Sequence, residues 1–157
     1  MIILALILGV TSPAPFASPE STRPAVAEVA AGWTLDEIIV ALRQVETGGS
    51  KSGGKRAVGD GGKAIGPLQI HRAYWEDSKI PGRFEDCREL PYARKVVCAY
   101  WQRYCPKALE ALDAETLARV HNGGPAGPKK ESTKVFWKKI ERELDRQREK
   151  RRRGTLV

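Results

Sequence analysis

The sequence predicts a mainly α-helical domain with one small β-hairpin. Three observations lead to this fold class. Apolar residues recur at helical spacing in several segments, glycine and proline separate those segments, and strand signals are confined to the glycine-rich stretch between Lys55 and Leu68. With 157 residues, of which 41% are hydrophobic, the chain can form one domain with a buried core and is short for two.

The first helix is predicted to begin after Thr34. Thr34 and Glu37 have the spacing of a capping box, in which each side chain binds a backbone N–H at the helix start. One apolar face then repeats at helical spacing, formed by Leu35, Ile38, Ile39 and Leu42. The same spacing reaches Glu46, and Gly48 follows as a residue that ends helices in the left-handed conformation. We therefore expect Glu46 in the last helical turn, on the apolar side.

Glu46 is the candidate general acid of the chain. Burial on an apolar face disfavours a charged carboxylate, and so does the negative end of the helix dipole. A carboxyl that stays protonated can donate its proton to a substrate. The alternative is a surface glutamate whose side chain turns out to water at a fraying helix end.

Asp60 is the second candidate carboxyl. It lies between Gly59 and Gly61 in a stretch too rich in glycine for a helix or a regular strand, which predicts a turn or hairpin tip. Water and backbone amides around such a loop keep an aspartate ionised. One protonated and one ionised carboxyl are what cleavage of a glycosidic bond requires. The alternative is that Asp60 serves only to make the tight turn.

The remaining elements are predicted as helices. A short helix is expected from Ile70 to Ser78, and a longer one from Pro91 to Tyr104 is expected to be the buried central helix. Asp113 can cap a helix that ends at Val120 or His121, before the Asn-Gly-Gly-Pro stop. An amphipathic pattern predicts a last helix from Ser132 to Lys150.

Several ordered motifs between about Trp33 and about Ile140 carry a family resemblance. They are Val45-Glu46-Thr47-Gly48, Gly66-Pro67-Leu68-Gln69-Ile70, His71-Arg72-Ala73-Tyr74-Trp75, Phe84-Glu85-Asp86-Cys87, Ala99-Tyr100-Trp101-Gln102-Arg103-Tyr104-Cys105 and His121-Asn122-Gly123-Gly124-Pro125. On these motifs the chain resembles the invertebrate-type, destabilase-like lysozymes, and their bacterial relatives most closely. The resemblance implies an α+β, lysozyme-like fold, with the hairpin beside the active-site cleft.

The resemblance also implies an activity. Members of this family hydrolyse the β-1,4 bond between N-acetylmuramic acid and N-acetylglucosamine in peptidoglycan, without a cofactor, and their catalytic glutamate and aspartate match Glu46 and Asp60. Some members are also isopeptidases that use a serine just before the glycine-proline pair. Here Lys63-Ala64-Ile65 precede Gly66, so we do not predict that activity. Two alternative functions remain: a lytic transglycosylase that uses Glu46 alone, and a non-catalytic peptidoglycan-binding module.

Five further residues are predicted to bind substrate. Side-chain and backbone amides beside glycines can recognise N-acetyl groups, and aromatic faces stack on sugar rings. The five residues are Gln69, Tyr74, His121, Asn122 and Gly123. Trp75 and Trp101 are weighed as stacking residues too, although an aromatic residue is more often part of the core. The two histidines and the cysteine spacings fit no ligand set, so we predict no metal site.

The two ends of the chain predict an exported protein with a basic extension. The apolar run from Ile2 to Val10 and the Ala25-Val26-Ala27 cleavage candidate predict a signal peptide over residues 1–27, and hence a secreted or periplasmic protein. A disordered leader or a misannotated start is the alternative. We expect the catalytic domain over 28–140 and a basic helical extension with a tail over 141–157, and no transmembrane segment.

Charge and cysteine content suggest partners and leave the disulfides open. Residues 129–157 hold twelve Lys or Arg and five Asp or Glu, so this end carries a surplus of seven out of the chain's net charge of +8. Such a tail can bind anionic cell-wall polymers, or it can be only a solvated helix end. Nucleic-acid binding is not predicted, because the basic run is short, terminal and free of aromatic residues. A disulfide, if present, involves Cys87 with an open choice of partner, and three reduced, buried thiols are the alternative.

Overall fold

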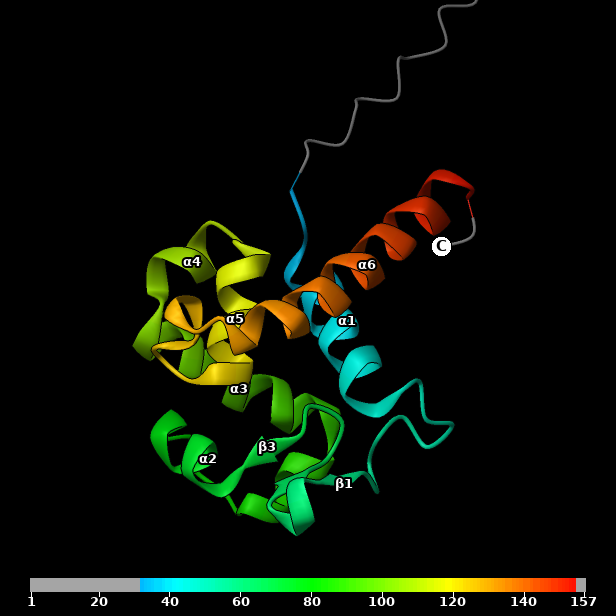
Figure 1. The fold of residues 1–157 in the computed structure, drawn as a ribbon. Coiled ribbons are helices and arrows are strands. Elements are labelled where there is room, and N and C mark those ends of the chain that lie inside the picture. Colours follow the sequence, from blue (N-terminus) through cyan, green and yellow to red (C-terminus); the bar gives the residue numbers. More distant parts are fainter. Residues whose placement is uncertain (1–31, 155–157) are drawn as a thin grey trace, which may run out of the picture. The chain divides into compact units, whose positions relative to one another are not determined.

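A computed structural model describes residues 32–154 (Figure 1). Six α-helices lie in this part of the chain: α1 Leu35–Thr47, α2 Arg72–Ser78, α3 Leu90–Tyr104, α4 Pro106–Glu110, α5 Ala114–Gly123 and α6 Ser132–Arg152. Three short strands are β1 Val58–Gly59, β2 Ala64–Ile65 and β3 Ile70–His71, and the 3-10 turns are η1 Asp60–Gly62, η2 Phe84–Arg88 and η3 Gly127–Lys129. The prediction of a mainly α-helical domain with a small amount of β-structure is confirmed.

The three strands form one antiparallel sheet in the order β1-β2-β3. Val58 pairs with Ile65 in the first hairpin, and Ile65 pairs with Ile70 in the second. The third strand corrects two predictions. Strand structure extends beyond Leu68, and the helix expected from Ile70 begins instead at Arg72, because Ile70 and His71 pair with β2. Two residues are too few for strand alternation to be visible in a sequence.

Helix α1 follows the sequence prediction at both ends. The Thr34 hydroxyl accepts from the Glu37 N–H, and the Glu37 carboxylate accepts from the Thr34 N–H at 2.8 Å, so the capping box is present. Gly48, with φ of 58°, ends the helix in the left-handed conformation. The buried face consists of Ile38, Ile39, Ala41 and Leu42. Packing of this face is the main source of stability for a helix of this length.

Helix α3 is the central helix of the core, as predicted. It contacts α2, α4, α5 and η2, and Figure 1 shows it between the sheet with α2 on one side and α4 with α5 on the other. Its buried face consists of Ala93, Val96, Val97, Tyr100 and Trp101. Trp101 is fully buried and its indole N–H donates to the Leu117 carbonyl at 3.1 Å. Trp101 is therefore a core residue, the more common of the two roles weighed for it, because no face of its ring reaches the surface.

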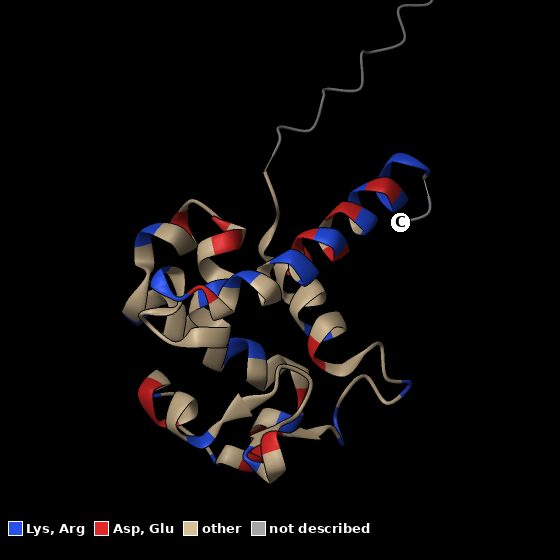
Figure 2. Ribbon diagram, in the orientation of Figure 1, with Lys and Arg blue, Asp and Glu red and all other residues tan. Residues whose placement is uncertain are grey.

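The later helices differ from the predictions in their extent. Pro106 starts a short helix, α4, that no apolar period predicted. Asp113 caps α5 as expected, but the helix continues to Gly123, and Gly124 with φ of 72° ends it. Helix α6 runs to Arg152 and packs along α1. Its charges of both signs form pairs three residues apart, such as Arg146 with Glu143 (Figure 2).

All three cysteines are free thiols, and Cys87 is buried while Cys98 and Cys105 are half-buried. The three thiols are therefore reduced, as the alternative to a disulfide had it, but only Cys87 is buried. Within residues 32–154, no helix is both long and apolar enough to cross a membrane. The predicted signal peptide lies outside the described residues.

Candidate active site

Glu46 lies in the last turn of α1, where the helix pattern placed it. Its side chain is 19% exposed, so most of the carboxyl is withdrawn from water. The turn around it is closed by Gly48 in the left-handed conformation and by the Thr47 hydroxyl, which donates to the Arg43 carbonyl at 2.7 Å. The helix end therefore holds the Glu46 side chain on the inner side of α1.

His121 is the partner that Glu46 meets. Nε2 of the His121 ring lies 3.5 Å from Oε1 of Glu46, and the His121 side chain is only 4% exposed. The other ring nitrogen, Nδ1, lies 3.3 Å from the Tyr74 hydroxyl. The structure thus brings together three predicted site residues that the sequence spreads over three helices, α1, α2 and α5.

Tyr74 is fixed by a cluster of tyrosines on α3. Its ring stacks on Tyr100, with centroids 3.6 Å apart and planes at 15°. Tyr100 in turn packs on Tyr104, whose hydroxyl donates to Asp77 at 3.0 Å. Burial raises the pKa of the Tyr74 phenol well above its ordinary value, with smaller contributions from Tyr100 and two cysteines. The phenol therefore keeps its proton. Tyr100 is a supporting residue that the sequence did not indicate, although the aromatic spacing on α3 was visible.

Asp60 has the opposite surroundings. It starts η1, between β1 and β2, and its side chain is 65% exposed. Its φ of 47° lies in the left-handed region, which aspartate and asparagine tolerate better than most residues. Oδ2 of Asp60 lies 3.6 Å from Nε2 of His71, a residue of β3 that the predicted site did not include. The contrast predicted between a withdrawn glutamate and a solvated aspartate is present.

Gln69 and Gly66 support the hairpin that carries Asp60. The Gln69 amide donates to the Gly66 carbonyl at 2.8 Å, and its Oε1 fills the space where a side chain on Gly59 would be. Gly66 has φ of 76°, and a Cβ there would lie 2.2 Å from the Cys87 carbonyl oxygen. These contacts explain the glycine-proline-x-glutamine motif. Gly66 allows the hairpin to approach η2 closely, and Gln69 packs against Gly59, the residue before Asp60.

Asn122 and Gly123 lie at the end of α5, directly after His121. Asn122 is exposed, and its side chain makes no hydrogen bond to the rest of residues 32–154. The Gly123 carbonyl accepts from Lys130 Nζ at 2.7 Å, and a side chain on Gly123 would collide with Thr133. Asn122 is thus free to meet a ligand, while Gly123 contributes a close backbone approach between α5 and α6.

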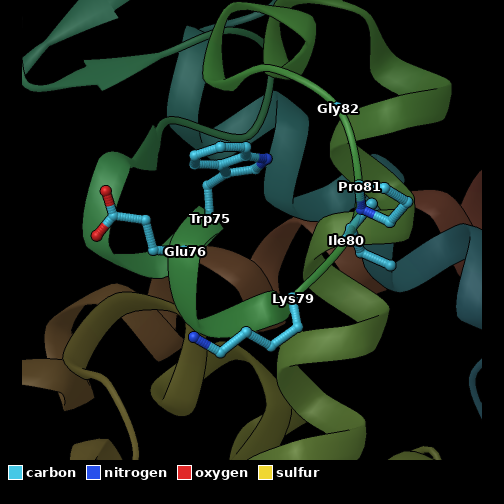
Figure 3. A pocket seen from close by; sticks show the side chains of 6 residues that line it. All are labelled: Trp75, Glu76, Lys79, Ile80, Pro81 and Gly82. Atoms are coloured by element: carbon cyan, nitrogen blue, oxygen red, sulfur yellow. The ribbon is translucent and has the colours of Figure 1, made fainter.

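Trp75 lines a surface pocket of about 400 Å³ together with Glu76, Lys79, Ile80, Pro81 and Gly82 (Figure 3). Its indole N–H donates to the Tyr92 hydroxyl at 2.8 Å, which fixes the orientation of the ring.

A second hollow of about 610 Å³ lies between α1 and the start of α3, lined mainly by apolar side chains such as Ile39, Val40 and Leu90. Glu46 and Asp60 line neither of the two. Within the described range, no three His, Cys, Asp or Glu side chains cluster as metal ligands would.

The arrangement can supply a proton and a negative charge. A half-buried carboxyl can act as the general acid, and an exposed carboxylate can meet the positive charge that develops at an anomeric carbon. Neither role requires a metal or a cofactor.

Comparisons with known families, sequences and solved structures all point to the same family. Residues 42–143 match the family called Destabilase. A lysozyme of Meretrix lusoria is 33% identical over 115 residues, which are 72% of this chain and 93% of that protein. Lysozyme 1 of Crassostrea virginica is 35% identical over 80 residues, 50% of this chain and only 44% of that longer protein. The crystal structure of Aeromonas hydrophila PliI in complex with Meretrix lusoria lysozyme matches with a TM-score of 0.57 and 30% identity, over 72% of this chain and 93% of that one.

Proposed function

The chain belongs to the Destabilase family, as its motifs predicted, and from this premise we propose that it is a lysozyme. Its substrate is the glycan strand of peptidoglycan, and the bond cleaved is the β-1,4 bond between N-acetylmuramic acid and N-acetylglucosamine. Relatives named lysozyme, which match in sequence and in structure, support this activity.

Glu46 is the proposed general acid. It protonates the glycosidic oxygen as the bond to the leaving sugar breaks. The observation that carries the proposal is the placement of its carboxyl, 19% exposed at the end of α1 and against the buried ring of His121. A surface glutamate on a fraying end would be solvated and would have no such partner.

Asp60 is the proposed second carboxyl. It stabilises or attacks the anomeric carbon as positive charge develops there. Its side chain is 65% exposed on a short turn, and the Gln69 side-chain amide holds the hairpin through its hydrogen bond to the Gly66 carbonyl. A lytic transglycosylase would need only Glu46, so the role of Asp60 distinguishes the two reactions.

Three of the five remaining predicted residues are proposed to surround the substrate. Asn122, exposed at the end of α5, is proposed to bind an N-acetyl group. Gln69 and Gly123 are proposed to shape the site indirectly, Gln69 through its hydrogen bond to the Gly66 carbonyl and Gly123 through the hydrogen bond that its carbonyl accepts from Lys130. Tyr74 and His121 are withdrawn beneath Glu46, which favours a supporting contact over a broad sugar-stacking surface.

Export and binding partners complete the proposal. A substrate in the cell wall fits a secreted or periplasmic protein, as the apolar N-terminal run predicted. The basic end of α6, Lys150 to Arg153, is proposed to bind anionic cell-wall polymers (Figure 2). Because Meretrix lusoria lysozyme forms a complex with PliI, a protein of that kind is a candidate partner of this chain as well.

The test is wall lysis followed by identification of the products. Purified cell walls should lose turbidity with the wild type, and the new chain ends should be reducing sugars. Anhydro-muramyl ends, formed equally well by an Asp60→Asn variant, would instead indicate a transglycosylase. Binding to walls without any turnover would leave only the binding-module function.

A further inference from the structure

We propose that Tyr74 and His121 form a positioning pair for Glu46: the Tyr74 hydroxyl donates to Nδ1 of His121, and Nε2–H of His121 donates to Oε1 of Glu46. The inference rests on the proposed function, since it assigns the pair a role in the same reaction. It leaves Oε2 of Glu46 as the oxygen that carries the acidic proton to the substrate.

The His121 ring is enclosed by three helices. Glu46 of α1 meets its Nε2, and Tyr74 of α2 meets its Nδ1 and packs against its edge, with centroids 5.5 Å apart. Phe136 of α6 lies against the ring with centroids 6.4 Å apart. A ring that is 4% exposed and contacted at both nitrogens has little surface left for a sugar. Its contacts point instead to a role exerted through Glu46.

The direction of the two hydrogen bonds follows from the tyrosine. A neutral imidazole has one N–H and one lone pair, and the hydrogen bond at one nitrogen decides where the proton sits on the other. The Tyr74 phenol keeps its proton because burial raises its pKa. A buried O–H needs an acceptor, and Nδ1 of His121 is the acceptor that it reaches among residues 32–154. The lone pair is then on Nδ1 and the proton on Nε2, facing Glu46.

This arrangement suits a general acid because it is the same before and after proton transfer. Nε2–H donates to the carbonyl oxygen of the protonated carboxyl, and to the same oxygen once the carboxylate has formed. The side chain therefore keeps its orientation through the reaction. The distances of 3.3 and 3.5 Å are longer than an ideal hydrogen bond, and contacts of this kind shorten when substrate fills a site.

Tyr74→Phe is the decisive variant, because it removes one oxygen and keeps the ring that stacks on Tyr100. Tyr104→Phe is its matched control: Tyr104 belongs to the same tyrosine cluster, but its hydroxyl bonds Asp77. We expect kcat for wall lysis to fall about tenfold in Tyr74→Phe with KM within about twofold, since a misplaced acid slows the chemical step. Tyr104→Phe should keep the wild-type kcat. His121→Gln, which can still donate to Glu46, should retain more activity than His121→Ala.

The tautomer gives a readout that does not depend on catalysis. Imidazole ¹⁵N shifts in the folded protein should show His121 protonated on Nε2 in the wild type and a mixture of tautomers in Tyr74→Phe. His71, the other histidine of the chain, serves as an internal reference that Tyr74→Phe leaves unchanged. A wild type that leaves walls intact would reject the proposed function, and the ¹⁵N spectra would still decide the hydrogen bonds. An unchanged His121 tautomer, or a Tyr74→Phe kcat within twofold of wild type, would overturn the positioning pair.

Discussion

Arg151, in the last turn of α6, lies with Nη1 3.0 Å from Oε1 of Glu37, in the first turn of α1. The other carboxylate oxygen of Glu37, Oε2, accepts a hydrogen bond from the Thr34 N–H in the helix cap, so one side chain makes both contacts. Arg148, one turn earlier, stacks on Trp33 with its guanidinium 3.9 Å from the ring centroid. The end of α6 therefore holds the start of the helix whose other end carries Glu46.

Arg151→Ala should lower stability without changing the site. Oε1 of Glu37 is buried, and the substitution leaves it without the charge that compensates it, at a cost of about 1–3 kcal/mol. Chemical denaturation should show this loss, and Arg152→Ala, the exposed neighbour, should be close to wild type. Equal stability of the two variants would mean that the ion pair between Arg151 and Glu37 contributes nothing.

Trp101→Phe should destabilise the fold and leave substrate affinity unchanged. The variant removes the indole N–H that satisfies the Leu117 carbonyl and leaves a cavity beside it, which together cost about 2–4 kcal/mol. Urea denaturation measures the loss. KM for soluble glycan fragments should stay at the wild-type value, because Trp101 is fully buried. A raised KM in a folded variant would indicate that Trp101 contacts the substrate after all.

Stability should fall in alkaline solution between about pH 9 and pH 12. Burial, reinforced by Asp86 and Glu85, raises the pKa of the Cys87 thiol from 9.0 to about 12, and burial with Asp113 raises that of Cys105 to about 11. The folded state thus favours the neutral thiol. This contribution is complete below the unfolded value near 9 and is lost as the pH rises through the folded values.

The urea midpoint of the wild type should therefore decline from pH 8 to pH 11. Cys87→Ala should start from a lower midpoint at pH 8 because it leaves a small cavity, and should then decline less steeply. Parallel declines would show that ionisation of this thiol does not contribute to alkaline unfolding.

Asp60→Asn should slow wall lysis by about two to three orders of magnitude and leave the fold intact. The change removes the charge while the asparagine still accepts the left-handed backbone of this position. Glu76→Gln, which neutralises an exposed carboxylate on α2, is the control for a loss of surface charge. Lysis by Asp60→Asn at the wild-type rate would remove Asp60 from the mechanism.

The sequence was sufficient for α1, because its cap, its apolar face and its stop are all local signals. Thr34, Glu37 and Gly48 behave as their spacing predicted, and so Glu46 was correctly placed in the last turn. The same holds for α3, whose apolar face is long enough for its period to be seen. Asp60 was placed on a turn for a local reason too, since glycines flank it.

The rest depends on contacts between distant segments. Residues Ile70 and His71 form a strand only because β2 lies beside them, and Trp101 is core rather than surface because α5 covers it. The contact of Glu46 with His121 and Tyr74 joins three helices, and no local pattern encodes their distances. The motifs identified these residues through family resemblance, and only the fold shows that they meet.

The most direct test of the account is wall lysis by Glu46→Gln, which keeps the shape of the side chain and removes its acidic proton. We predict that turbidity loss of purified cell walls slows by at least about a hundredfold, with thermal stability and binding to the walls unchanged. A folded Glu46→Gln variant that lyses walls at the wild-type rate would contradict the assignment of Glu46 as the acid.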